Sequence, residues 1–210
     1  MEFEFPDENG KPYKSNGGEM VWNEELQKEI PKGWEVKELH NIIENFDSKR
    51  KPIAGSDRQS KEKIYPYYGA AALMDYIDEY IFDGEYILLG EDGSVVTENG
   101  TPILQFVWGK FWVNNHAHVL KGINGFNEDS LYMLLRNTNI TDIITGGVQL
   151  KINQSNLNAI PILKPSSKIM EKYNLVLNPI FHLFKCKTNQ TVKLNELNNI
   201  LLSKLATIEN

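Results

Sequence analysis

Residues 86–93 read Tyr-Ile-Leu-Leu-Gly-Glu-Asp-Gly, and the apolar half of this stretch sets the expected fold. A continuous apolar run of four residues that ends at glycine is too short for a buried helix and is typical of a strand buried on both faces. Residues 103–107, Ile-Leu-Gln-Phe-Val, form a second run of this kind. We therefore expect these two segments to be central strands of a β core.

The surrounding sequence extends this pattern over residues 65–119. Aromatic and β-branched residues are frequent there, and tight turns are indicated by glycines at regular intervals. These glycines are Gly69, Gly84, Gly90, Gly93, Gly100 and Gly109. The segment is expected to form several short strands.

Helical patterns flank this β-rich segment. Asn127 can cap a helix that continues to residue 135, with acidic residues in its first turn. Residues 19–29 show a loosely helical spacing that predicts one short helix. Residues 34–39 alternate as a strand does, but residues 39–46 equally fit one face of a helix, and the sequence alone leaves both open.

The C-terminal part predicts a long helix. Ser166 and Ser167 can cap it, Pro179 is expected to interrupt it, and it should continue almost to the C-terminus. Its apolar residues follow an imperfect heptad repeat, which favours a coiled coil with a partner helix. Packing of the helix back onto its own domain is the alternative. The stripe consists of Ile180, Leu183, Leu194, Leu197, Leu201, Leu205 and Ile208. The predicted class is α+β, with a short-stranded β core, flanking helices and this long helix.

Composition limits the class of protein. The chain has 210 residues, of which 41% are hydrophobic and 24% charged, so a globular domain with an appendage is expected. Cys186 is the single cysteine, which excludes an internal disulfide and a thiolate metal cluster. Acidic and aromatic residues follow Met1, so no secretory signal is expected, and no apolar run is long enough for a membrane span. We expect a soluble, cytoplasmic protein.

The charges are unevenly distributed. The formal net charge is −6, but residues 49–63 are rich in lysine and arginine and lie between two acidic segments, residues 1–48 and 64–148. The tail from Lys164 onward is also rich in lysine. Such a basic segment is either a solvated loop or a nucleic-acid contact. The net charge does not decide between them, because DNA affinity depends on the few cations that meet phosphates.

Few residues suggest chemistry. His116 and His118 would lie on one face of a strand and could form half of a metal site, with a third ligand from Glu91 or Asp92. Histidines in an apolar strand are more often hydrogen-bonded structural groups, and Glu91-Asp92 between two glycines resembles a turn. Because common hydrolase, nucleotide-binding and methyltransferase signatures are absent, we predict neither catalytic residues nor a bound metal.

Six pieces of the chain, in order, resemble the specificity subunit of type I restriction-modification enzymes, specifically one target recognition domain and its conserved helix. The most diagnostic piece is residues 145–154, Thr-Gly-Gly-Val-Gln-Leu-Lys-Ile-Asn-Gln. The other pieces are residues 5–18 with 23–26, 30–36, 65–70 with 75–78, 90–93 and 109–119. The resemblance implies a DNA target recognition domain over residues 1–165, which includes an N-terminal linker segment at residues 1–30, and a spacing or dimerisation helix over residues 166–210.

The same resemblance implies a non-catalytic protein that binds double-stranded DNA, modification (methyltransferase) subunits and restriction subunits. S-adenosylmethionine, ATP and Mg are expected only on those partner subunits, with no cofactor in this chain. Members of the family normally carry two recognition domains and two helices, whereas this chain has one of each. It is therefore expected to be either a half-length form that dimerises through its helix or a piece of a longer subunit.

The candidate DNA-binding residues share a basic or amide side chain. Lysines are expected at phosphates, and arginines and amides at base edges. The candidates are Lys49, Arg50, Lys51, Arg58, Lys61, Lys63, Lys110, Gln149, Lys151 and Asn153. Two other classes of protein remain as alternatives. One is an oligomerisation or adaptor module that uses the helix without binding DNA, and the other is a metal-dependent hydrolase using His116, His118 and Asp92.

Overall fold

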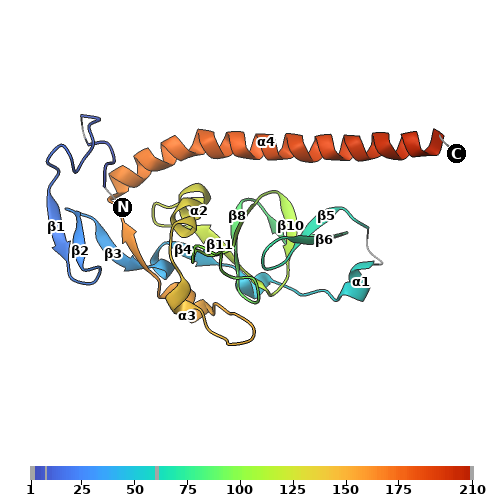
Figure 1. Cartoon of the computed structure of the whole chain (residues 1–210), viewed down its shortest axis with the longest axis horizontal. Coiled ribbons are helices and arrows are strands. Elements are labelled where there is room, and N and C mark those ends of the chain that lie inside the picture. Colours follow the sequence, from blue (N-terminus) through green and yellow to red (C-terminus); the bar gives the residue numbers. More distant parts are fainter. Residues whose placement is uncertain (1–2, 8, 60–61, 209–210) are drawn as a thin grey trace.

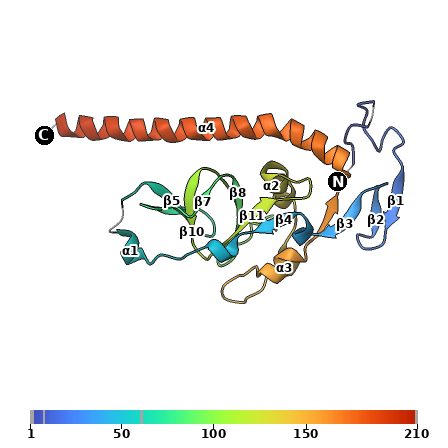
Figure 2. The same cartoon turned by 180° about the vertical axis from the view of Figure 1, so that it is seen from behind.

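The computed structural model describes residues 3–7, 9–59 and 62–208. A β-rich domain lies along one long helix, α4 (Ser167–Ile208), which follows the long axis of the molecule (Figure 1). The view from behind shows the same arrangement (Figure 2). The α+β class predicted from the sequence is confirmed. No helix among the described residues is both long and apolar enough to cross a membrane.

Two four-stranded sheets form the body of the domain. The first is antiparallel and has the order β4 (Ile43–Asn45), β11 (Ala117–Gly122), β8 (Tyr86–Gly90), β9 (Leu104–Val107). The second has the order β6 (Leu73–Ile77), β5 (Tyr65–Tyr68), β10 (Lys110–Val113), β7 (Phe82–Asp83), and its β5–β10 pair is parallel. The expected series of short strands over residues 65–119 is confirmed.

Two small antiparallel pairs and several short helices complete the domain. The pairs are β1 (Met20–Asn23) with β2 (Lys28–Pro31), and β3 (Glu35–Glu38) with β12 (Pro161–Lys164). The α-helices besides α4 are α1 (Gly55–Gln59), α2 (Glu128–Arg136) and α3 (Gln154–Asn158). Single 3₁₀ turns occur at Leu39–Asn41, Asp47–Lys49 and Thr141–Ile143.

The helix predicted for residues 19–29 is wrong, because this segment is the β1–β2 hairpin. The hairpin reverses at Gln27, whose φ of 48° a helix does not allow. The backbone N–H of Leu26 donates to Asn23 Oδ1 within the turn. Cross-strand pairing therefore overrides the weak helical spacing.

Strand β8 is buried on both faces, as its apolar run predicts. Ile87 and Leu89 face one apolar cluster with α2, and Leu88 faces a second cluster that contains Phe111. The paired strand β11 alternates in the same way, so that His118, opposite Leu89, lies on the α2 side. The expected cap of α2 is also present: Asn127 Oδ1 accepts from Ser130 N at 2.9 Å.

Pro179 does not interrupt α4, contrary to the expectation. The helix contains 42 residues, which corresponds to a length of about 63 Å. Pro179 removes the hydrogen bond to Leu175, and both residues are on the solvent-exposed side, where water can replace the lost donor. The first turns of α4 curve toward the domain (Figure 1).

Two faces of α4 have different surroundings. One face packs on the domain through buried Met170, Leu177 and Phe181, and Lys185 forms an ion pair with Glu85 at 2.5 Å. The predicted heptad stripe faces solvent: its residues Ile180, Leu183, Leu194, Leu197, Leu201 and Leu205 are between 52% and 65% exposed. The side chain of Ile208 lies outside the described part. The helix therefore packs on its own domain and still presents an apolar face.

Because β8 is buried on both faces, truncating one of its side chains should clearly lower the stability of the domain. Leu89→Ala should lower the free energy of unfolding by about 3 kcal/mol, because it leaves a cavity in a packed core. Urea unfolding followed by circular dichroism measures this. Leu73→Ala on the exposed edge strand β6 is the matched control and should cost about 1 kcal/mol or less. Equal losses in the two variants would contradict the buried position of β8.

Candidate functional site

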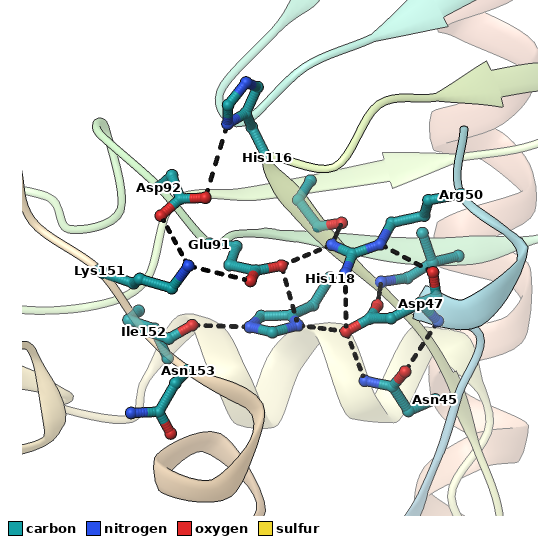
Figure 3. A network of polar contacts seen from close by, with 12 residues as sticks. Asn45, Asp47, Arg50, Glu91, Asp92, His116, His118, Lys151, Ile152 and Asn153 are labelled. Atoms are coloured by element: carbon teal, nitrogen blue, oxygen red, sulfur yellow. Dashed lines mark hydrogen bonds and ion pairs between the residues drawn. The ribbon is translucent and has the colours of Figure 1, made fainter. Parts of the chain in front are cut away.

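Three segments meet beside the ends of β8 and β11 and form a network of charged groups (Figure 3). We define the His118 network as Asp47, Arg50, Glu91, Asp92, His118 and Lys151. Asp47 lies just before the basic segment and Arg50 lies at its start, Glu91 and Asp92 follow β8, and Lys151 closes a loop before α3. Gly90 allows the chain that follows Glu91 and Asp92 to pass close to the end of β8, because a Cβ there would lie 2.6 Å from Ser94 O.

His118 lies at the centre of the network, and its side chain is 1% exposed. Its Nδ1 lies 2.6 Å from Asp47 Oδ2, and its Nε2 lies 2.8 Å from the backbone oxygen of Ile152. The imidazole therefore spans the distance between the basic segment and the chain just before α3. Both ring nitrogens are engaged inside the protein.

Arg50 contacts two carboxylates of the network, those of Asp47 and Glu91. Its Nη1 donates to Glu91 Oε2 and to the backbone oxygen of Ala117, each at 2.6 Å. Its Nη2 lies 3.4 Å from Asp47 Oδ2, and its Nε donates to the backbone oxygen of Asp47 at 3.1 Å. Most of the donor capacity of the guanidinium group is thus used within the chain.

Lys151 connects the network to the surface. Its Nζ lies 3.2 Å from Asp92 Oδ1 and 3.6 Å from Glu91 Oε1, while its side chain is half-exposed. The hydrogen bond and the charge of Asp92 raise the pKa of Lys151 above its usual value. His116 Nδ1 lies 3.6 Å from the other oxygen of Asp92, Oδ2.

Asp47 is ionised in spite of its position. Burial acts to raise the pKa of this carboxyl group, but the hydrogen bond and charge of His118, the N–H of Val119 and the charge of Arg50 together lower it below 3.8. Val119 N donates to Asp47 Oδ1 at 2.9 Å. The carboxylate therefore anchors the basic segment to strand β11.

The geometry of the network also bears on the alternative of a metal-dependent hydrolase. Ligand atoms of Asp47, Glu91 and His118 lie within 4.8 Å of one another. The Arg50 guanidinium group, however, already contacts both carboxylates and supplies the compensating positive charge. Because His118 Nε2 faces a backbone oxygen, the arrangement is better described as an internal ion-pair cluster than as a metal centre or a hydrolase site.

Residues 145–151 form a pinched loop next to the network. Thr145 and Lys151 exchange two backbone hydrogen bonds of 2.8 Å each, and Gly146 has a φ of 89°. A Cβ at Gly146 would lie 2.0 Å from the backbone oxygen of Gln149, so this turn requires glycine. Val148 and Gln149 are exposed at the tip. The loop lies on the side of the domain opposite to α4 in both views (Figures 1 and 2).

The predicted DNA-binding residues fall into two groups. The side chains of one group already have partners in the domain: Arg50 in the network, Arg58 with Asp75 and the ring of Tyr67, and Asn153 as the cap of α3. The exposed group comprises Lys49, Lys51, Lys63, Lys110, Gln149 and Lys151, of which Lys63 and Lys151 also form ion pairs at the surface. Lys61 lies outside the described residues. For every candidate, the DNA contact itself stays a prediction.

Some of the exposed lysines already contact an aromatic ring or an acidic group of the domain. Lys49 Nζ lies 4.9 Å from the ring of Phe46, and Lys110 Nζ lies 4.6 Å from the ring of Tyr80. Lys63 Nζ lies 2.9 Å from Asp75 Oδ1. These contacts leave the ammonium groups at the surface, where they can exchange partners.

Sequence reasoning missed the role of Asp47, which lies in no motif. It treated His118 as a structural histidine and Glu91-Asp92 as a turn, without bringing them together with Arg50 and Lys151. The usable signal was the alternation in β11, which places His118 on the same face as Leu120 and opposite Leu89. A polar residue on that buried face requires hydrogen-bond partners from elsewhere in the chain.

Removing the Asp47 charge should destabilise the domain in a pH-dependent way. Asp47→Asn should cost about 3 kcal/mol at pH 7, because Arg50 and His118 lose a buried partner. Since the pKa of Asp47 is lowered in the folded state, its contribution is complete above about pH 4 and is lost as the pH falls through the folded pKa. The difference between the two proteins should therefore shrink below pH 4.

Urea unfolding of wild type and variant between pH 3 and pH 8 measures this difference. Asp142→Asn, at an exposed aspartate, is the control and should change stability by less than about 0.5 kcal/mol. A difference that stays constant down to pH 3 would contradict the lowered pKa of Asp47 in the folded state.

Comparison with known proteins agrees with the resemblance found in the sequence. A family model described as the type I restriction modification DNA specificity domain matches residues 31–196. A chain from Haemophilus influenzae that is named as a type I restriction enzyme specificity subunit is 36% identical over 145 residues, which cover 69% of this chain and 36% of that one. The MjaIX specificity subunit of Methanocaldococcus jannaschii is 27% identical over 93% of this chain and 48% of its own length.

A solved structure shares the fold. The crystal structure of a type I restriction-modification S subunit from M. genitalium superimposes with a TM-score of 0.56 at 12% identity, over 73% of this chain and 39% of that chain. The present chain spans less than half of the length of the two curated relatives. Because the family model covers most of the chain, including the β domain from β3 onward and the first two-thirds of α4, the chain belongs to the type I restriction-modification DNA specificity domain family.

Proposed function

We propose that this chain is a non-catalytic specificity subunit of a type I restriction-modification system, which reads one half of a bipartite DNA site and docks the modification subunits. The observation that carries the proposal is the family match from residue 31 to residue 196, which includes the recognition domain after its N-terminal segment and most of the helix. Relatives of this chain carry the name of specificity subunits.

The proposed DNA surface combines the exposed start of the basic segment with the 145–151 loop. Lys49, Lys51 and Lys151 present ammonium groups that can neutralise phosphates. Gln149 at the loop tip can accept and donate at a base edge. Arg50 and Arg58 serve the protein itself, so we assign them to the support of this surface rather than to base contact. Lys63 and Lys110 are candidates for further phosphate contacts.

We further propose that the exposed stripe of α4 pairs with the α4 helix of a second copy. An unpartnered apolar stripe of this length is costly in water, and a two-fold pair of helices would bury both stripes. Two recognition domains held by such a pair would match a DNA site with two halves. In the full complex, S-adenosylmethionine, ATP and Mg would be bound by the modification and restriction subunits, and the assembly would act on DNA in the cytoplasm.

The adaptor alternative rests on the same exposed stripe but needs no DNA contact. Salt-dependent DNA binding discriminates between the two functions, because only a DNA-binding surface releases counterions from phosphates. Helix-driven assembly with no measurable DNA binding would favour the adaptor.

Two lysines at the start of the basic segment allow a direct test of DNA contact. Lys49→Ala combined with Lys51→Ala should weaken duplex binding and reduce the slope of log Kd against log salt by about 1.8, which is about 0.9 for each lost phosphate contact. The complex with the modification subunit should be titrated with duplex DNA at several salt concentrations. Lys28→Ala with Lys37→Ala, which removes two exposed lysines from β2 and β3, is the control. An unchanged slope in the test variant would reject the assignment.

The helix stripe predicts an oligomeric state. Light scattering of the purified chain should give the mass of a dimer, and Leu197→Asp with Leu201→Asp should give a monomer, because two buried carboxylates would oppose pairing. Circular dichroism should show that the domain remains folded, since both residues face solvent in the single chain. Leu73→Asp, at an exposed position on β6, should leave the dimer intact. A wild-type monomer would contradict the proposed pairing.

A further inference from the structure

We propose that His118 is a positioning residue, which holds the 145–151 loop in register with the basic segment so that base contacts and phosphate contacts occur together. This inference rests on the proposed DNA-recognition function. It assigns to a fully buried side chain an effect on sequence discrimination, although His118 itself touches no DNA.

The first argument is the connection that His118 makes. Its Nε2 contacts the backbone oxygen of Ile152, directly after the 145–151 loop, at 2.8 Å. Its Nδ1 contacts Asp47, which precedes Lys49 and Lys51, at 2.6 Å. One rigid imidazole ring thus fixes the distance between the ends of two exposed elements (Figure 3).

Glu91 makes a second connection parallel to the first. Its Oε2 accepts from Arg50 in the basic segment, and its Oε1 lies 3.6 Å from Lys151 Nζ. Its backbone oxygen accepts from Ile152 N at 2.9 Å. Glu91 directly follows the fully buried strand β8. The basic segment and the 145–151 loop are therefore both held in place relative to the core.

The backbone of the 145–151 loop couples the position of its ends to the position of its tip. The paired hydrogen bonds between Thr145 and Lys151 close it, and the Gly146 turn restricts its backbone. Leu150 O also accepts from Gly93 N at 2.9 Å, so Val148 and Gln149 are presented by a closed loop that is held next to the residues following β8. A displacement at Ile152 would move the tip relative to Lys49 and Lys51.

Energetics favour positioning over stability as the role of the network. Burying charged groups carries a desolvation cost, and apolar residues of similar volume often stabilise a core equally well or better. Base edges discriminate only when donors and acceptors are closely aligned, whereas phosphate contacts tolerate displacement. Loosening the loop should consequently reduce discrimination while the electrostatic part of the affinity is kept.

Two variants separate the two contacts of His118. In His118→Asn the amide nitrogen replaces Nδ1, which keeps the contact with Asp47 and removes the one with Ile152. In His118→Gln the amide nitrogen replaces Nε2, which keeps the contact with Ile152 and removes the one with Asp47. The basic segment remains attached to β11 in both variants through the Asp47 contact with Val119 N and the Arg50 contact with the Ala117 oxygen.

The first measurement is hydrogen exchange on the chain without DNA. The hydrogen-bonded amides of Thr145, Lys151 and Ile152 should exchange at least about tenfold faster in His118→Asn than in wild type, and in His118→Gln they should stay within about threefold of wild type. Urea unfolding of both variants shows whether any difference follows global stability instead. Equal exchange in the two variants would overturn the proposal.

The second measurement uses the complex with the modification subunit and two duplexes of equal length. One carries the sequence that the wild-type complex methylates, and the other has that sequence shuffled. His118→Asn should reduce the ratio of the two Kd values by about tenfold or more, with an unchanged salt slope on the shuffled duplex. His118→Gln should keep most of the ratio.

The outcomes distinguish this inference from the proposed function. If the wild-type complex prefers neither duplex, the proposed function fails, and the positioning role fails with it. If wild type discriminates and both variants lose discrimination in proportion to their stability, or neither loses it, His118 is only structural and the positioning role is rejected.

Discussion

The pairing of β8 with β11 is the constraint on which the rest of the domain depends. It places Leu89 opposite His118 and Ala117 opposite Gly90, so the imidazole, the Ala117 oxygen and the residues after Gly90 all face the same volume. The apolar clusters on the two sides of β8 make this register costly to change, because a shift by one residue would reverse every side chain. The charged network is thus built at the ends of two strands that are buried on both faces.

The helix α4 illustrates how one element can satisfy two requirements. The face that carries Leu177 and Phe181 completes the core, where Phe181 packs at 5.2 Å from the ring of Phe106. Trp108 Nε1 donates to Asn189 Oδ1 at 3.3 Å farther along the helix. The heptad stripe is rotated away from this face and remains exposed. Attachment to the domain therefore fixes the direction in which the stripe points, and with it the direction from which a partner helix could approach.

The sequence predicted the parts of the fold in which local pattern and tertiary context agree. The run Tyr86 to Leu89, the Asn127 cap and the long C-terminal helix are examples, since burial period and capping chemistry are local properties. It failed at residues 19–29, where cross-strand pairing decides the conformation, and at Pro179, where solvent exposure removes most of the penalty of a proline. Neither pairing partners nor the solvent side of a helix can be derived from a short window of sequence.

The sequence named Arg50, His118 and Lys151 individually but did not predict the network that joins them, and the DNA contacts stay predictions. Lysine-rich patterns identify groups that could meet phosphates, but they do not show which cations the protein uses internally. Arg50 and Lys49 are adjacent in the chain, yet one is enclosed by Glu91 and Asp47 while the other reaches solvent. The difference arises from carboxylates that lie more than forty residues away or on the other side of a turn. Recognition surfaces of this kind depend on charged residues that never reach the ligand, because a lysine or an amide can discriminate only as well as the buried groups that hold its backbone in place.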